Sequence, residues 1–158
     1  ARCGLDAQVS NWALEDGELR YLDVSTPLLR DDAGRESLDT AIFLSSLPWA
    51  LRPLVRRFLL RGILDKYYDP RGALVDVLGN LYKEGLGERI PALIEVANAQ
   101  LGAAAPITGA EVARYYRSDA RTWDALQRLR RLDRAWQTRI RRRPYPFLLP
   151  GRIERHTG

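Results

Sequence analysis

The chain has 158 residues, 46% of them hydrophobic, which suits one domain with a buried core and excludes global disorder. It carries 25 Lys and Arg against 20 Asp and Glu, a formal net charge of +5. No apolar run approaches the roughly 20 residues that cross a bilayer, so we expect no membrane partner.

Residues 9–23 are predicted to form a β-hairpin. The runs "VSNWAL" and "ELRYLDV" alternate apolar and polar residues, and "EDG" between them supplies turn residues, with Gly17 able to adopt a positive φ. The alternation places Leu19, Tyr21 and Asp23 on one face of the second strand.

The rest of the chain is predicted to be helical. Asp69 is expected to cap a helix that Pro70 opens, and "TGAE" at Thr108–Glu111 has the pattern of a capping box. Ser118 is then expected to cap a separate last helix. The predicted helices cover residues 37–47, 53–68, 70–85, 89–101, a short segment after Thr108, and 119–143.

The last predicted helix carries an apolar stripe along one face, and we expect this stripe, including Trp123 and Trp136, to lie in the core. The stripe consists of Trp123, Leu126, Leu129, Leu132, Trp136 and Ile140. The expected fold is therefore mainly α with a small β-hairpin at its N-terminus, in one domain. Its parts are a loop and hairpin at 1–27, a helical subdomain at 37–143 and an irregular tail at 144–158.

Asp6, Asn11 and Asp23 are the candidate functional residues. A carboxylate before a strand can orient a substrate hydroxyl and accept its proton, and the hairpin returns Asp23 toward Asn11. Magnesium prefers oxygen ligands and is usually held by one or two carboxylates together with substrate phosphates. The alternative is ordinary turn and strand-end chemistry, in which Asp6 is a loop residue and the other two cap strands.

The run "DAQVSN", followed twelve residues later by the Asp of "YLD", resembles the catalytic loop and metal-binding segment of the protein-kinase-like fold. It is most similar to the aminoglycoside phosphotransferase branch of that fold. The resemblance implies that Asp6 is the catalytic base and that Asn11 and Asp23 bind magnesium. It also implies that the chain is the mostly helical C-terminal lobe of such an enzyme.

The sequence departs from that family's pattern in three places. Gly4 stands where the family has His, and "DVS" at 23–25 has neither the Phe nor the Gly of the protein-kinase version. The glycine-rich loop, the strand Lys and its partner Glu have no counterpart. The chain also has no methionine and opens with Ala1. We therefore expect a fragment that lacks the N-terminal lobe and is itself inactive.

The function that the resemblance implies is transfer of the γ-phosphoryl group of a nucleotide to a small-molecule hydroxyl. The implied cofactor is Mg²⁺ with ATP or GTP. The implied partners are the nucleotide, the hydroxyl acceptor and the absent N-terminal lobe. A single cysteine, Cys3, and no visible basic-then-apolar leader lead us to expect a cytoplasmic protein.

The alternative function is a helical module that binds nucleic acid or protein through its arginine-rich C-terminal helix. This hypothesis requires the arginines to form one continuous exposed stripe. They are Arg128, Arg130, Arg131, Arg134, Arg139, Arg141, Arg142 and Arg143. Because no nucleic-acid-binding motif accompanies them, nucleic acid is not favoured as a partner.

Two other features are given structural roles. His156 stands alone near the end of the sequence and is not expected to bind a metal. The run "KYYDPRG", residues 66–72, is interpreted as a turn between two helices with aromatic anchors, in which Arg71 is the residue able to face a phosphate.

Overall fold

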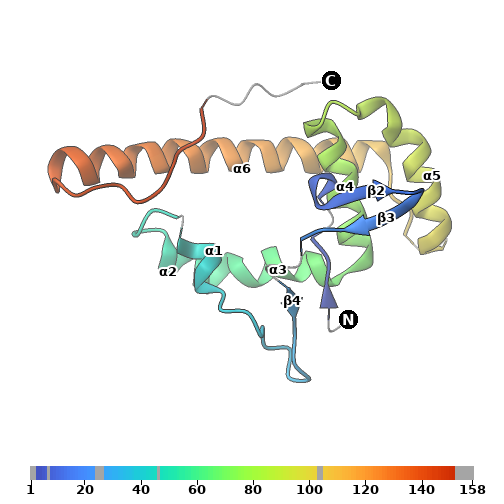
Figure 1. Cartoon of the computed structure of the whole chain (residues 1–158), viewed down its shortest axis with the longest axis horizontal. Coiled ribbons are helices and arrows are strands. Elements are labelled where there is room, and N and C mark those ends of the chain that lie inside the picture. Colours follow the sequence, from blue (N-terminus) through green and yellow to red (C-terminus); the bar gives the residue numbers. More distant parts are fainter. Residues whose placement is uncertain (1–2, 7, 24–26, 46, 103–104, 152–158) are drawn as a thin grey trace.

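The computed structural model of the chain describes residues 3–6, 8–23, 27–45, 47–102 and 105–151. It is mostly helical, with two small two-stranded antiparallel sheets, and so confirms the mainly-α fold with a β-hairpin. Figure 1 shows the long helix α6 along one side of the molecule and α1 to α3 along the other, with α4, α5 and the hairpin at one end.

The two sheets are built from the first 29 residues. β1 (Cys3–Gly4) pairs with β4 (Leu28–Leu29), and β2 (Trp12–Glu15) pairs with β3 (Glu18–Tyr21).

The hairpin β2–β3 is confirmed but shorter than predicted. Asp16 and Gly17 both adopt a positive φ, as a tight two-residue hairpin turn requires. Trp12 faces Tyr21 across the strands, with ring centroids 5.1 Å apart. The predicted start at residue 9 instead forms the 3₁₀ turn η1 (Val9–Asn11).

The helices follow in chain order. They are α1 (Ala41–Ser45), α2 (Arg52–Leu54), the π-helical η2 (Val55–Leu59), α3 (Leu60–Tyr68), α4 (Pro70–Lys83), the 3₁₀ turn η3 (Gly87–Arg89), α5 (Ile90–Leu101), α6 (Gly109–Ala135) and the π-helical η4 (Trp136–Ile140). The predicted helix at 37–47 shortens to α1, because the Asp39 carboxylate accepts the Ala41 amide and starts the helix there.

The Asp69 cap and the capping box of Thr108 and Glu111 are both confirmed. Asp69 accepts the Gly72 amide at 2.9 Å. Thr108 accepts the Glu111 amide at 3.2 Å. The Glu111 carboxylate also makes two bonds of 2.8 and 2.7 Å to the Arg71 guanidinium, and its pKa is lowered first by Arg71 and in addition by a hydrogen bond from the Thr108 backbone amide. A bidentate charged pair is stronger than one bond to a backbone amide.

The predicted break at Ser118 is wrong, since α6 runs without interruption from Gly109 to Ala135 and continues as η4. Ser118 lies inside the helix, where its carbonyl accepts the Thr122 hydroxyl at 2.9 Å. No Gly or Pro stands between residues 110 and 143, so nothing in the sequence breaks the helix. It ends near Arg142, which adopts a φ of +52°.

Two apolar clusters form the core. One joins α4, α5 and α6 around the fully buried Leu78, Ile107 and Val112. The other joins β4, α1 and α3, and it consists of Leu28, Leu44, Leu60, Leu64 and Tyr68.

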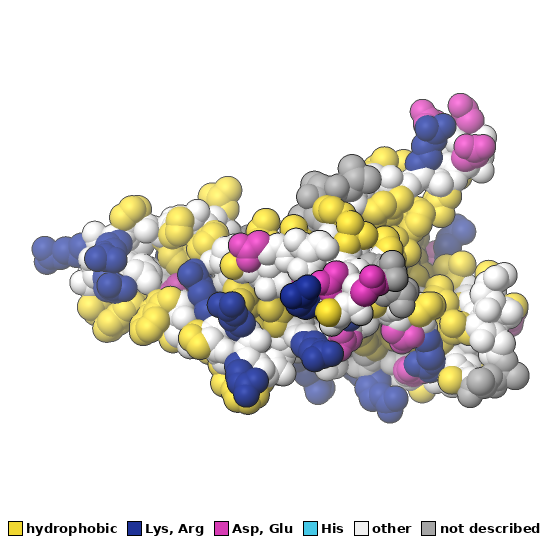
Figure 2. All heavy atoms as spheres, turned by 90° about the horizontal axis from the view of Figure 1, so that it is seen from below, with side chains coloured by type: hydrophobic (Ala, Val, Ile, Leu, Met, Phe, Trp, Pro, Cys, Tyr) yellow, Lys and Arg dark blue, Asp and Glu magenta, His cyan; other side chains and the backbone are white. Residues whose placement is uncertain are grey.

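The expectation that Trp123 and Trp136 lie in the core is wrong, because they are 42% and 48% exposed. α6 packs against α4 and α5 and extends well past them (Figure 1). Figure 2 accordingly shows apolar side chains at the surface among the Lys and Arg side chains. Among the described residues, no helix is both long enough and apolar enough to span a membrane.

Replacing two helical glycines with alanine should change the free energy of unfolding in opposite directions. A Cβ on Gly79 of α4 would lie 2.8 Å from Cδ1 of Tyr115, whereas a Cβ on Gly62 of α3 meets nothing within 4 Å. Gly79→Ala should lower the free energy of unfolding by about 1–3 kcal/mol through overpacking. Gly62→Ala should raise it by about 0.5–1 kcal/mol through helix propensity.

Urea unfolding of the two variants and the wild type measures both changes. Because both substitutions are Gly→Ala inside a helix, Gly62→Ala is the matched control. An equal shift in both variants would show that α4 and α6 do not approach closely at Gly79.

Candidate functional site

The segment before the hairpin is fixed to the end of α3. The Leu5 amide donates to the Tyr67 carbonyl at 2.8 Å. A Cβ on Gly4 would lie 3.1 Å from both Cβ of Leu28 and Cε1 of Tyr68. The Tyr68 ring therefore occupies the space beside Gly4 and leaves little room for a larger side chain there.

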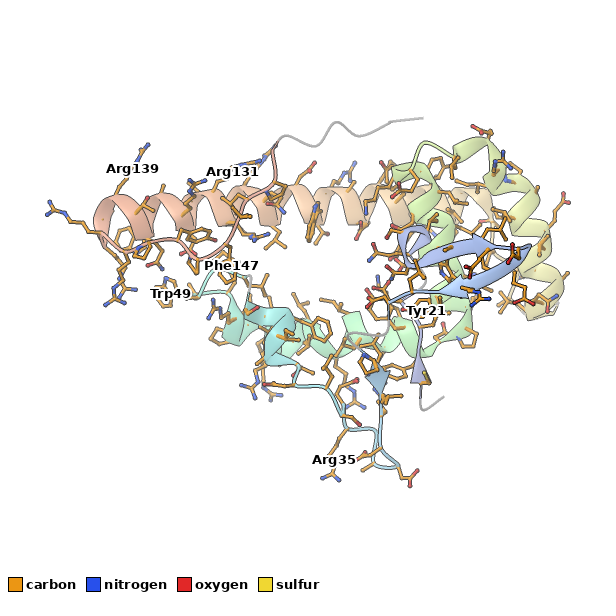
Figure 3. All side chains as sticks on the ribbon, in the orientation of Figure 1. Tyr21, Arg35, Trp49, Arg131, Arg139 and Phe147 are labelled. Atoms are coloured by element: carbon orange, nitrogen blue, oxygen red, sulfur yellow. The ribbon has the colours of Figure 1, made fainter. Side chains whose placement is uncertain are left out.

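The backbone carbonyl of Asp6 is the point at which the loop and the hairpin meet. It accepts the Asn11 side-chain amide at 3.1 Å and the Tyr21 hydroxyl at 3.2 Å. Tyr21 lies at the end of β3 (Figure 3). Two side chains from different elements thus hold the Asp6 backbone in one position.

The Asp6 carboxylate is half-buried and poorly compensated. The Gln8 side-chain amide lies 3.4 Å from Oδ2, and Oδ1 is buried without a hydrogen-bond partner among the described residues. Burial and then the negative charge of Asp76 raise the pKa of Asp6 above its ordinary value, against weaker opposing effects of Gln8 and Lys66. A raised pKa makes a carboxylate a better proton acceptor near neutral pH.

Tyr21 links the three residues that the sequence singled out. Its hydroxyl bonds to the Asp6 carbonyl, and burial followed by the charges of Asp6 and Asp23 raises the pKa of its phenol, while a hydrogen bond from Asn11 lowers it. The Asp6 carbonyl and the Asn11 side chain thus bond to this hydroxyl, whereas Asp23 influences it through its negative charge. Sequence reasoning missed Tyr21 as a site residue, although the strand alternation placed it on the same face as Asp23.

A buried polar cluster lies beneath this site and joins three helices. Nζ of Lys66 on α3 is 3.1 Å from Oδ1 of Asp76 on α4 and 2.9 Å from the hydroxyl of Tyr115 on α6. The Tyr115 hydroxyl donates to the same carboxylate oxygen. Burial alone lowers the pKa of Lys66, but the bond to Tyr115 and the charge of Asp76 outweigh it, and the net shift is upward.

A second cluster fixes the segment after β4. The Arg30 guanidinium pairs with Glu36 at 2.6 Å and with Asp65 at 2.7 Å. It also lies 3.9 Å from the centroid of the Tyr68 ring, whose hydroxyl donates to Glu36 at 2.6 Å. Tyr68 thus holds both this segment and the strand of Gly4.

Asn11 and Asp23 are the residues that could hold a cation here. Because the Asn11 amide nitrogen is used on the Asp6 carbonyl, a cation would meet its side-chain oxygen. The described residues contain no group of three or more His, Cys, Asp or Glu suited to a metal. A magnesium site completed by nucleotide phosphates needs only one or two protein carboxylates. A magnesium ion nearby would suit the Asp6 carboxylate oxygen that is buried without a hydrogen-bond partner among the described residues. The metal-binding role of Asn11 and Asp23 stays a prediction.

Arg71 does not face a phosphate. Its guanidinium is taken up by Glu111 and by the carbonyls of Ala105 and Pro106. The interpretation of residues 66–72 as a turn between helices is confirmed by α3, the Asp69 cap and α4.

The C-terminal arginines do not form one continuous exposed stripe. Arg130 is only 8% exposed, and its guanidinium lies 6.0 Å from the centroid of the Phe147 ring. The other seven arginines of the set are exposed. His156 lies outside the described residues.

Sequence comparison assigns the chain to a family. Residues 1–134 match the profile of DUF6206, a family of unknown function. Because this match covers more than half of the 158 residues, the chain belongs to that family. Comparison with curated proteins gave no match, and comparison with solved structures gave none.

Replacing Asp6 should stabilise the fold. A raised pKa means that the ionised carboxylate destabilises the folded state above that pKa, and protonation removes the penalty as the pH falls. Asp6→Asn should therefore raise the free energy of unfolding at pH 7 by about 0.5–2 kcal/mol, as is common where a functional group is held in unfavourable surroundings. The gain should shrink as the pH falls through the raised pKa and should be absent well below 3.8, the ordinary pKa, where the carboxyl is neutral in both states.

Denaturant unfolding at pH 7 and at pH 3 measures this difference. Asp16→Asn, which removes the same charge from the exposed hairpin turn, is the matched control and should change stability by less than about 0.5 kcal/mol. A loss of stability in Asp6→Asn at pH 7 would contradict the prediction.

Proposed function

We propose that this chain provides the proton-accepting and magnesium-binding part of a kinase-like phosphotransferase that acts on a small-molecule hydroxyl. The observation that supports this best is the bonding of the Asn11 side chain and the Tyr21 hydroxyl to the Asp6 carbonyl, together with the charge of Asp23, which helps to raise the pKa of Tyr21.

Asp6 is the proposed proton acceptor. Its backbone is fixed by Asn11 and Tyr21, so its carboxylate keeps one orientation relative to the hairpin. Its raised pKa and its buried, unpartnered oxygen suit a group that accepts a proton from a substrate hydroxyl held beside it.

Asn11 and Asp23 are the proposed magnesium ligands. When bound, magnesium would offset the charge of the phosphates of ATP or GTP, and most catalysis of phosphoryl transfer depends on such charge stabilisation. The sequence has no glycine-rich loop to hold those phosphates. In this proposal that half of the nucleotide site comes from an N-terminal lobe outside the 158 residues, and the chain alone is inactive or nearly so.

Cation binding tests the proposal on the chain itself. Mn²⁺, which takes the same oxygen ligands as Mg²⁺, is titrated with and without ATP while electron paramagnetic resonance measures the free ion. We expect one site whose dissociation constant rises at least tenfold in Asp23→Asn, because the variant loses the charged ligand.

The matched control is again Asp16→Asn, which should bind Mn²⁺ within twofold of the wild type. Asp6→Asn should also keep most of the affinity, because Asp6 is proposed to act on the proton rather than on the metal. If the wild type binds no Mn²⁺, or if the two control variants weaken binding as much as Asp23→Asn does, the proposal fails.

A further inference from the structure

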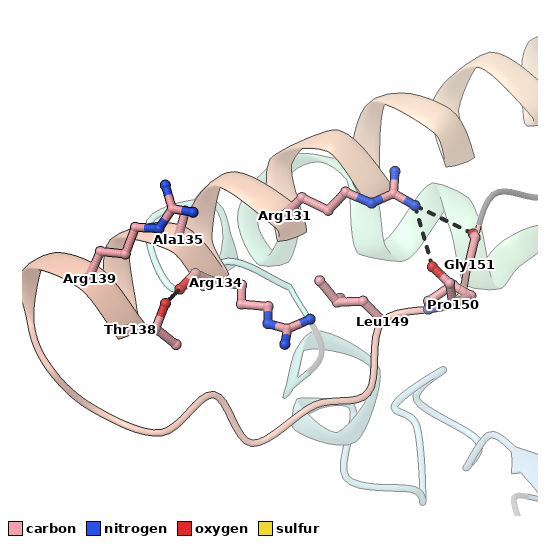
Figure 4. A pocket seen from close by; sticks show the side chains of 8 residues that line it. All are labelled: Arg131, Arg134, Ala135, Thr138, Arg139, Leu149, Pro150 and Gly151. Atoms are coloured by element: carbon pink, nitrogen blue, oxygen red, sulfur yellow. Dashed lines mark hydrogen bonds between the residues drawn. The ribbon is translucent and has the colours of Figure 1, made fainter.

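A cationic pocket lies between the C-terminal end of the long helix and the tail that follows it (Figure 4). It is far along the chain from the hairpin site and shares no residue with it. Its lining consists of Arg131, Arg134, Ala135, Thr138, Arg139, Leu149, Pro150 and Gly151.

The three arginines share one face of the helix. Arg131 and Arg134 are three residues apart, so an α-helix places them on the same side. In an ordinary α-helix, Arg139 would be turned about 80° away from Arg131, since eight residues at 3.6 per turn overshoot two turns. The wider π turn of η4 lies between them and reduces that offset.

The tail forms the opposite wall. The Arg131 guanidinium donates to the carbonyls of Pro150 and Gly151 at 3.3 and 3.4 Å. Next to it, Arg130 lies under the Phe147 ring, which packs edge-on against Tyr145 with centroids 5.7 Å apart. These contacts hold residues 145–151 against the helix and turn an exposed face into a pocket.

Among the described residues, no acidic group compensates the charges of the pocket. In the described ranges, none of Arg131, Arg134 and Arg139 pairs with a carboxylate, and none of the lining residues is acidic. The nearest acidic residue in sequence, Asp133, accepts from the Gln137 side chain at 3.5 Å instead. Elsewhere in the protein, arginines do find carboxylates, as Arg30 and Arg71 show. Like charges on one helix face destabilise the helix, and an anion would relieve that repulsion.

We propose that this pocket binds a soluble anion that carries two or more phosphate groups. The planar guanidinium fork matches two oxygens of a phosphate group, and three forks on one face suit several linked phosphates better than one carboxylate. Leu149, Pro150 and Ala135 give the pocket an apolar side, on which a non-phosphate part of the ligand can rest.

Binding of inorganic tripolyphosphate tests this inference. It is measured by calorimetry at physiological salt with EDTA present, so that no metal site contributes. Arg134→Gln/Arg139→Gln should raise the dissociation constant at least tenfold. The matched control Arg117→Gln/Arg121→Gln removes the same charge from exposed positions of the same helix outside the pocket, and it should stay within twofold.

Further measurements distinguish binding in this pocket from non-specific electrostatic binding and from binding at the hairpin site. Asp23→Asn should leave tripolyphosphate binding unchanged, which keeps this inference independent of the proposed phosphotransfer. Failure of the wild type to bind tripolyphosphate at about 1 mM, a concentration that would detect even weak binding, would overturn it. An equal loss of tripolyphosphate affinity in the two double variants would also overturn the inference. The same holds if a single-stranded oligonucleotide binds more tightly than tripolyphosphate and both double variants reduce its affinity equally.

Discussion

The buried carboxylate of Asp76 is the point on which the arrangement of the helices depends. It lies in the middle of α4 and is 6% exposed, and it is compensated by Lys66 from α3 and Tyr115 from α6. Removing one partner of a buried charged group leaves the other uncompensated, which is far more costly than the pair itself is favourable. The contact of Lys66, Asp76 and Tyr115 therefore holds three helices together, and losing any one of these side chains would leave each of the others without one of its partners. Gly79, one turn further along α4, gives the Tyr115 ring the room to reach it.

The same carboxylate also shapes the candidate site. Asp6 lies close enough to Asp76 for the two negative charges to interact, and this repulsion adds to the effect of burial on the pKa of Asp6. The loop keeps Asp6 there because its backbone, and not its carboxylate, makes the strong contacts with Asn11 and Tyr21. A side chain held in surroundings that disfavour its charge is common in functional sites and rare elsewhere. Asp76 therefore contributes both to the packing of the three helices and to the raised pKa of Asp6.

Local chemistry decided which parts of the structure were predictable from the sequence. The turn at Asp16 and Gly17, the cap at Asp69 and the helix after Pro70 depend on neighbours within a few residues, and these predictions are confirmed. The prediction at Ser118 was wrong because a capping residue is a weak local signal, and the run from 110 to 143 without Gly or Pro outweighs it.

Long-range contacts were invisible to the same reasoning. Lys66 and Tyr115 are 49 positions apart, and Arg71 and Glu111 are 40 apart, so no spacing rule connects them. The apolar stripe of α6 showed which face of the helix is apolar but not whether another element covers it. Of the candidate site, the three residues were found from their spacing, whereas Tyr21 and the polar cluster beneath it required the folded chain.

The placement of the four tryptophans affects how unfolding of this protein can be followed. Trp49, Trp123 and Trp136 are 56%, 42% and 48% exposed, and Trp12 lies in the hairpin, so none belongs to either core cluster. The core contains tyrosines instead, Tyr68 and Tyr116. Intrinsic tryptophan emission will therefore report on the periphery of the molecule. Melting of the core will be seen by circular dichroism and by tyrosine absorbance, and the two kinds of signal need not change at the same temperature.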